Sequence, residues 1–119
     1  MIGSTARHIA IGALALTGII HLILAPEYMG EQAYIGLLFI AGGLSTIALA
    51  AWLWLRDQAV AWLAAAVICA GMAIGFVLSR TIGLPGFHEA EWELSGVISV
   101  LLELTVIGIA IRPLSLQEA

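Results

Sequence analysis

A single carboxylate inside the last apolar stretch is the residue whose position most clearly suggests chemistry. Glu103 lies ten positions after Glu93, which puts it about 15 Å below the outer end of a helix. A carboxylate at that depth in a membrane costs several kcal/mol unless it is protonated or paired, so Glu103 is a candidate functional residue. The alternative is a structural role, in which a protonated Glu103 binds a neighbouring helix and fixes the packing.

Three polar residues precede Glu103 at intervals of four: Glu91, Ser95 and Ser99. This spacing predicts that all four side chains lie along one face of a helix. Such a face would line the interior of a bundle or a watery cavity that opens outward. The pattern therefore predicts one polar wall of a ligand or ion site.

His21 is the second candidate. It lies one turn before the outer end of the first apolar run, and Thr17 lies one turn deeper on the same face. Its expected depth is about 6 Å, against about 15 Å for Glu103, so a direct contact requires a helix tilt or a bridging water. The alternative is a histidine that is simply hydrogen-bonded near the membrane interface.

Arg80 and His88 belong to the outer side of the chain, around the long loop 81–90. Arg80 is predicted to pair with acidic residues of the loop or to extend toward lipid headgroups. Alternatively, it binds an anionic group such as a lipid phosphate or a substrate carboxylate. His88 adds an imidazole to the same side and is therefore a further candidate for the ligand site.

The possible metal ligands on the outer side are His21, His88, Glu27 and Glu89. Imidazole and carboxylate groups suit zinc, copper or iron, but the spacing of these residues matches no metal signature. The glutamates at 89–93 also suit the positive end of a helix dipole. We therefore predict no specific metal site, and the pattern assigns neither a cofactor nor a catalytic group.

The composition indicates what must position these residues. Of the 119 residues, 62% are hydrophobic and 10% are charged, and none is a lysine. Soluble proteins are about 45–50% apolar, so a water-soluble domain of this composition could not cover its surface with charge. The net charge of −4, without a basic tract, excludes nucleic acid as a partner and leaves the lipid bilayer as the expected environment.

Four apolar runs follow one another along the chain, at 9–25, 34–55, 59–79 and 92–111. Each is close to the ~20 residues that a helix needs to cross a bilayer, where only helices and closed barrels satisfy the backbone. The runs lack the alternation of barrel strands. We predict an all-α integral membrane four-helix bundle that forms a single domain, 1–119. Pro26 is expected to end the first helix and Pro113 the last.

The arginines predict the orientation in the membrane. Arg7, Arg56 and Arg112 fall on one side of the predicted bundle, and Arg80 alone falls on the other. The positive-inside rule places the first three in the cytoplasm. Five glutamates gather on the opposite side: Glu27, Glu31, Glu89, Glu91 and Glu93. We predict an inner-membrane protein with both termini in the cytoplasm.

Small residues recur at helical spacing in the second and third apolar runs. They are Gly36, Gly42 and Gly43 in the second run, and Gly71, Gly75 and Ser79 in the third. Such positions let helix backbones approach closely in lipid. The pattern predicts close contacts, either within the bundle or with another subunit.

One segment carries a resemblance. Residues 80–85 read Arg-Thr-Ile-Gly-Leu-Pro, followed by Glu-Trp-Glu at 91–93 and by Glu103, while residues 21–27 read His-Leu-Ile-Leu-Ala-Pro-Glu. The chain resembles small bacterial four-helix membrane proteins that carry an Arg-Thr-x-Gly-Leu-Pro segment before the last helix. The resemblance covers the first helix, the last loop and the last helix. It implies an architecture and no activity.

Three functions fit these features. The first is an accessory or assembly subunit of a membrane complex, with a polar outward-facing site and another membrane protein or a second copy as partner. The second is a small oligomeric transporter or ion conductor that uses Glu103, Ser95 and Ser99 as its polar path. The third is a membrane redox or metal-binding protein with an outer His/Glu site. The residue pattern does not decide whether the protein is an enzyme.

Overall fold

The computed structural model describes the backbone of residues 3–118 and the side chains of residues 3–112. The chain forms four helices: α1 (Ser4–Glu31), α2 (Ala33–Leu55), α3 (Ala59–Arg80) and α4 (Leu94–Glu118). Each is long and apolar enough to cross a membrane, with Leu94–Arg112 as the apolar part of α4. The described residues include no β-strand, only a bridge between Leu84 and Phe87. The all-α, four-helix prediction is confirmed.

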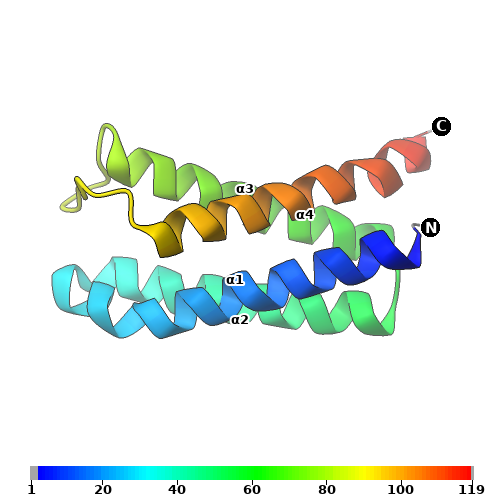
Figure 1. Cartoon of the computed structure of the whole chain (residues 1–119), viewed down its shortest axis with the longest axis horizontal. Coiled ribbons are helices and arrows are strands. Elements are labelled where there is room, and N and C mark those ends of the chain that lie inside the picture. Colours follow the sequence, from blue (N-terminus) through cyan, green and yellow to red (C-terminus); the bar gives the residue numbers. More distant parts are fainter. Residues whose placement is uncertain (1–2, 119) are drawn as a thin grey trace.

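The helices form an elongated bundle in which consecutive helices run in opposite directions (Figure 1). The most extensive packing is between α1 and α2, followed by α3 with α4 and α1 with α4, and α2 with α3 is the weakest of these four neighbouring pairs. The start of α1, the α2–α3 connection and the end of α4 lie at one end, here called the termini end. The turn after α1 and the segment 81–93 lie at the opposite end, here called the loop end.

α1 does not end at Pro26 but continues to Glu31, so the prediction that this proline terminates the helix is wrong. A proline removes one backbone hydrogen bond, and membrane helices tolerate that loss where neighbouring groups compensate. The continuation has a consequence for the site. Tyr28 lies on α1 itself, seven residues after His21 and therefore on the same helix face.

A single residue, Gln32, connects α1 and α2. Its backbone N–H donates to Tyr28 O at 2.9 Å and so closes the end of α1. Gly36 allows α2 to pass close to the turn, because a Cβ at that position would lie 1.9 Å from Met29 Cγ. The tight turn fixes α1 and α2 as a hairpin.

The bounds of α4 differ from the predicted 92–111. The helix begins at Leu94 and runs through Pro113, so the prediction that this proline ends it is also wrong. Glu91 precedes the helix, and its backbone carbonyl accepts a hydrogen bond from Arg80 Nε at 3.1 Å. The predicted stripe of four polar residues on one helix face therefore loses its first member.

Glycines mark two different kinds of helix contact. A Cβ on Gly43 of α2 would lie 2.9 Å from Gly18 O and 2.8 Å from Leu22 Cγ of α1, so these two helices touch backbone to backbone. Gly71 and Gly75 of α3 would meet nothing within 4 Å. Within the bundle, the predicted close approach is present at Gly43, whereas Gly71 and Gly75 make no such contact because α3 stands away from α2 there.

The half of the bundle toward the termini end has a closely packed apolar core. Leu14, Leu53, Trp62 and Val106, one from each helix, are fully buried in it. The indole N–H of Trp62 donates to Asp57 Oδ1 at 2.6 Å. The buried polar side chains lie instead at mid-depth and toward the loop end: Thr17, Thr46, Ser79, Arg80, Ser99 and Glu103.

Candidate functional site

Four polar side chains meet at mid-depth between α1 and α4; we call Thr17, His21, Ser99 and Glu103 the polar cluster. Thr17 Oγ1 lies 2.8 Å from Glu103 Oε2, and Ser99 Oγ lies 3.2 Å from the same oxygen. The two hydroxyl oxygens are 2.5 Å apart. His21 Nε2 lies 4.0 Å from Glu103 Oε2. Three residues predicted for the site, His21, Ser99 and Glu103, thus come together, and Thr17 is the fourth member of the cluster.

Helical spacing on two helices builds the polar cluster. Thr17 and His21 are one turn apart on α1, and Ser99 and Glu103 are one turn apart on α4, so each pair shares a face. Glu103 is only 1% exposed. Each hydroxyl has one proton, so one hydroxyl donates to the carboxylate and the other donates to the first hydroxyl. These bonds replace part of the hydration that the buried carboxyl group loses.

The hydrogen bonds of His21 fix which ring nitrogen is available. Nδ1 lies 2.8 Å from Thr17 O, and because a carbonyl can only accept, Nδ1 carries a proton and donates it. Nε2 is then the nitrogen that faces Glu103. In the neutral ring Nε2 is an acceptor, and in the protonated ring it is the cationic partner of the carboxylate.

Ser99, His21 and Glu103 have the residue types of a hydrolytic triad but not its arrangement. In a triad, the histidine nitrogen beside the serine takes the hydroxyl proton. Here that nitrogen is Nδ1, 3.4 Å from Ser99 Oγ, and its own proton points at Thr17 O. His21 therefore does not activate Ser99. The arrangement suits binding and holding a proton rather than nucleophilic attack.

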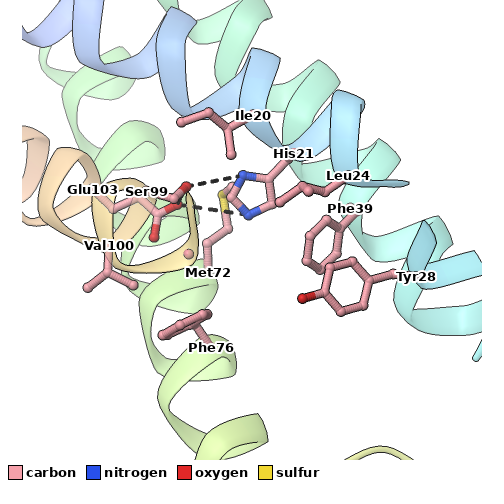
Figure 2. Close-up of a pocket in the computed structure, with 11 residues that line it drawn as sticks. Ile20, His21, Leu24, Tyr28, Phe39, Met72, Phe76, Ser99, Val100 and Glu103 are labelled. Carbon is pink, nitrogen blue, oxygen red and sulfur yellow. Dashed lines mark hydrogen bonds and ion pairs between the residues drawn. The ribbon is translucent and has the colours of Figure 1, made fainter. Parts of the chain in front are cut away.

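A cavity of about 20 Å³ adjoins the polar cluster. Figure 2 shows the His21 ring projecting from α1 toward Ser99 and Glu103, with Met72 of α3 beside it. Tyr28 also lines this cavity. The space is about the size of one water molecule or one ligand hydroxyl group.

A larger groove of about 360 Å³ lies between α2 and α3, in the half of the bundle toward the loop end. Gly71 and Gly75 form part of its wall, where no side chain fills the space. Leu38 and Val67 also line the groove and are 59% and 60% exposed. The groove therefore opens on the outer surface of the bundle.

The groove and the small cavity share part of their walls. His21, Phe39, Met72 and Phe76 line both spaces. His21 packs against the Phe39 ring with a centroid distance of 4.9 Å. His21 is thus the polar residue at which the apolar groove meets the polar cluster.

Arg80 belongs to a second polar group at the loop end. Its Nη2 donates to Tyr28 Oη at 2.9 Å and lies 3.2 Å from Glu93 Oε1, which also accepts from Tyr28 Oη at 2.9 Å. Nη1 donates to Ser79 Oγ at 2.8 Å, and Nε donates to the Glu91 carbonyl at 3.1 Å. All three nitrogens are engaged, so Arg80 ties α1, α3 and the segment before α4 together.

Three residues predicted for the site lie outside the polar cluster, as does Arg80. His88 is exposed in the loop, where its Nε2–H donates to Thr81 O at 2.9 Å. Ser95 lies partly buried on α4, one turn nearer the loop end than Ser99, and takes no part in the hydrogen bonds of the polar cluster. Glu91 is exposed and contributes its carbonyl group to Arg80. The predicted site therefore divides into two regions.

The candidate metal ligands do not converge. His21 faces α4 inside the bundle, whereas Glu27 is exposed on α1 and His88 and Glu89 belong to the loop segment. Among the described residues, no three His, Cys, Asp or Glu side chains are grouped so that they could hold a metal ion. The side chains of the polar cluster do converge, so the cluster is a better-supported candidate site than the candidate metal ligands.

Tyr28 is the residue of this region that is not predicted from the sequence. It lines the small cavity and hydrogen-bonds to Arg80. The available signal is its spacing of seven residues from His21, which is the spacing of one helix face. The expectation that Pro26 ends the helix conceals that relation.

Comparisons with protein-family models, with curated proteins and with solved structures find no match for this chain. Functional conclusions therefore rest on the polar cluster and on the groove that meets it at His21.

Proposed function

We propose that the chain is an integral protein of a bacterial inner membrane with both termini in the cytoplasm. The distribution of arginine supports this orientation, because Arg7 and Arg56 belong to the termini end and Arg80 to the loop end. In this orientation the polar cluster lies near the middle of the bilayer. The groove between α2 and α3 then lies in the extracytoplasmic half.

The function that the geometry supports best is the binding of a lipid-soluble ligand in the α2–α3 groove, with the polar end of the ligand at His21. The observation that carries this proposal is that an apolar groove open to the bundle surface meets a buried polar cluster at one histidine. Its volume of about 360 Å³ falls in the usual range for small-ligand sites, about 300–1,000 Å³. A partner helix about 10 Å across would need a much larger trough.

An accessory or assembly role in a membrane complex remains a prediction that accords with this function. The connection 56–58 is short, and the longer segment 81–93 is tied to the bundle by Arg80 and by Phe87, which packs against Tyr28, so little of the chain between its helices extends beyond the bundle. A subunit of this shape could hold a ligand within the bilayer for another membrane protein or for a second copy of itself. The partner's catalytic groups would then act on the ligand.

The transport alternative receives less support from the packing. The polar residues of the α1–α4 interface reach down to Glu103, and the residues below it, including Leu14, Val106 and Ala110, are buried and apolar. A polar path across the whole membrane would therefore have to run between subunits. No such interface is needed for the ligand-binding function.

The ligand-binding function is tested by filling the groove with side chains. Gly71→Leu and Gly75→Leu place new side chains where a Cβ meets nothing within 4 Å, so the fold should tolerate them. Gly12→Leu and Gly108→Leu are matched controls, because both glycines are exposed on other helices and are equally free of neighbours. The protein is purified in mild detergent, and lipid-soluble compounds that remain bound are extracted and identified by mass spectrometry.

We expect one class of compound to be present in the wild type and in both controls, and to be depleted several-fold in the two groove variants. The reason is that a leucine side chain would occupy the space of the ligand. Equal retention of every compound in all five proteins would overturn the proposed function.

A further inference from the structure

We propose that the ligand of the α2–α3 groove is a neutral amphiphile with a hydroxyl-bearing aromatic head, of the isoprenoid hydroquinone class, whose hydroxyl donates to His21 Nε2. This inference rests on the proposed function and names the chemistry of its ligand. It is argued from the polar atoms left uncommitted in the groove, from the charge around it and from the side chains of its walls.

Few polar atoms in the groove remain free to recognise a head group. Four lining residues have polar side chains: His21, Ser45, Ser79 and Arg80. The Ser79 hydroxyl donates to Phe76 O at 2.7 Å and accepts from Arg80, whose nitrogens are all engaged. Among the described interactions, His21 Nε2, Ser45 Oγ and the second N–H of Arg80 Nη1 keep hydrogen-bonding capacity, and of these three residues His21 alone also lines the small cavity beside the polar cluster.

With a neutral His21 ring, the polar cluster favours a donor from the ligand. His21 Nδ1 is occupied as a donor to Thr17 O, so Nε2 of the neutral ring accepts. Glu103 Oε2, 4.0 Å away, is also an acceptor when the carboxyl group is ionised. Two acceptors that face each other beside a cavity of hydroxyl size favour an O–H group over a carbonyl oxygen.

The charge distribution argues against an anionic lipid head. Arg80 is the cation nearest the groove, and its charge is paired with Glu93 at 3.2 Å. Glu103 lies at the inner end, and when its carboxyl group is ionised a phosphate there would add a second negative group beside it, with the charge of Arg80 already paired. A buried unpaired charge is costly, so a neutral head is favoured.

The walls suit an aromatic ring with an apolar tail. Phe39, Phe76 and Phe87 line the groove together with Met72, and aromatic rings and thioethers pack favourably against a flat ring. Leu38 and Val67 at the exposed side leave a lateral exit toward lipid. A long isoprenoid chain can therefore remain in the bilayer while the ring lies near His21.

The test measures binding of decylhydroquinone, kept reduced under nitrogen, to the purified wild-type protein and to two variants of His21. His21→Asn keeps a donor in the place of Nδ1 and removes the acceptor at Nε2, whereas His21→Gln keeps a polar group near the place of Nε2. We expect about a tenfold weaker Kd for His21→Asn and a change of less than about threefold for His21→Gln, since one hydrogen bond is at stake.

A second measurement uses only the wild-type protein and so does not depend on how the variants fold. The dimethyl ether of decylhydroquinone has the same ring and tail but no O–H donor, and it should bind about tenfold more weakly. Phosphatidylglycerol in mixed micelles should not compete. Equal binding of the ether, equal binding to His21→Asn, or effective competition by phosphatidylglycerol would overturn the inference.

The Gly71→Leu variant separates this inference from the proposed function. Binding that is lost in Gly71→Leu but unchanged in His21→Asn would preserve the groove as a ligand site and refute the role of His21. A compound of another class that is depleted by groove filling would refute the hydroquinone assignment alone. Insensitivity to groove filling would refute the proposed function itself.

Discussion

The α1–α2 and α2–α3 interfaces share helix α2 and are both rich in glycine, but they have opposite structures. Between α1 and α2, Gly18 and Gly43 bring the backbones so close that a Cβ on either would meet a carbonyl oxygen within 3 Å. Between α2 and α3, Gly71 and Gly75 border an open groove. A small-residue repeat therefore indicates a surface without side chains and does not indicate what covers it.

The difference follows from how helices associate in lipid. No hydrophobic force drives two apolar helices together there, so close packing and hydrogen bonds decide which pairs touch. The single-residue turn at Gln32 joins α1 and α2 at the loop end, and the close contact between Gly18 and Gly43 holds them together farther along. α3 is held instead by α4 and, at the loop end, by the bonds of Arg80 to Tyr28 and Glu93. This leaves the space beside α2 free.

The largest effect is expected from a substitution at the α1–α2 crossing, where the two helix backbones are closest. Gly43→Ala would put a methyl group 2.9 Å from Gly18 O and 2.8 Å from Leu22 Cγ, so the helices must separate. We expect a loss of about 3 kcal/mol in the free energy of unfolding, at the upper end for overpacked sites. Thermal or denaturant unfolding in detergent, followed by circular dichroism, measures it. Wild-type stability in this variant would contradict the close contact.

A smaller effect is expected from releasing α3 at the loop end. Arg80→Leu removes the bonds to Tyr28, Ser79 and Glu93 but keeps an apolar side chain over the Phe76 ring. We expect a loss of about 2 kcal/mol, because hydrogen bonds to a charged group are each worth more than neutral ones. Faster hydrogen exchange at 81–93, with unchanged exchange in the first half of α1, would be the accompanying signature.

The control for the Arg80 variant is Arg56→Leu, at the opposite end of the bundle. Arg56 is exposed and lies just after α2, so its loss should change the unfolding free energy by less than about 0.5 kcal/mol. Equal losses in the two variants would show that the contacts of Arg80 contribute nothing specific.

The sequence predicts the parts of this molecule that depend on local pattern. Four apolar runs suffice for four helices, because a bilayer leaves the backbone no other arrangement for such runs. The spacing of Glu103 and Ser99, and of His21 and Thr17, suffices to place each pair on one face. The two faces meet because α1 and α4 are neighbours in the bundle.

The parts that escaped prediction depend on contacts between distant segments. Pro26 predicts a helix end in the sequence. A proline removes only one local hydrogen bond, however, and the packing of the bundle outweighs that loss. The groove depends on where α3 rests, and nothing in the repeat of Gly71 and Gly75 encodes the distance to α2. The pairing of Arg80 with an acidic residue is one of the alternatives that the sequence offers, but its bonds to Tyr28 of α1 and to the Glu91 carbonyl are not predictable from its position.

The smallest expected effect is that of Gly71→Ala. It is the most informative, because this variant should gain stability whereas Gly43→Ala should lose it. Gly71→Ala adds a methyl group that meets nothing within 4 Å and replaces a flexible residue in a helix interior. Alanine is favoured over glycine there by about 0.5–1 kcal/mol, so the variant should be slightly more stable than the wild type. Gly108→Ala, equally free of neighbours on α4, should behave alike. If Gly71→Ala were destabilised while Gly108→Ala was not, another chain or helix would have to cover the groove. The open space between α2 and α3 would then be part of an interface with that partner.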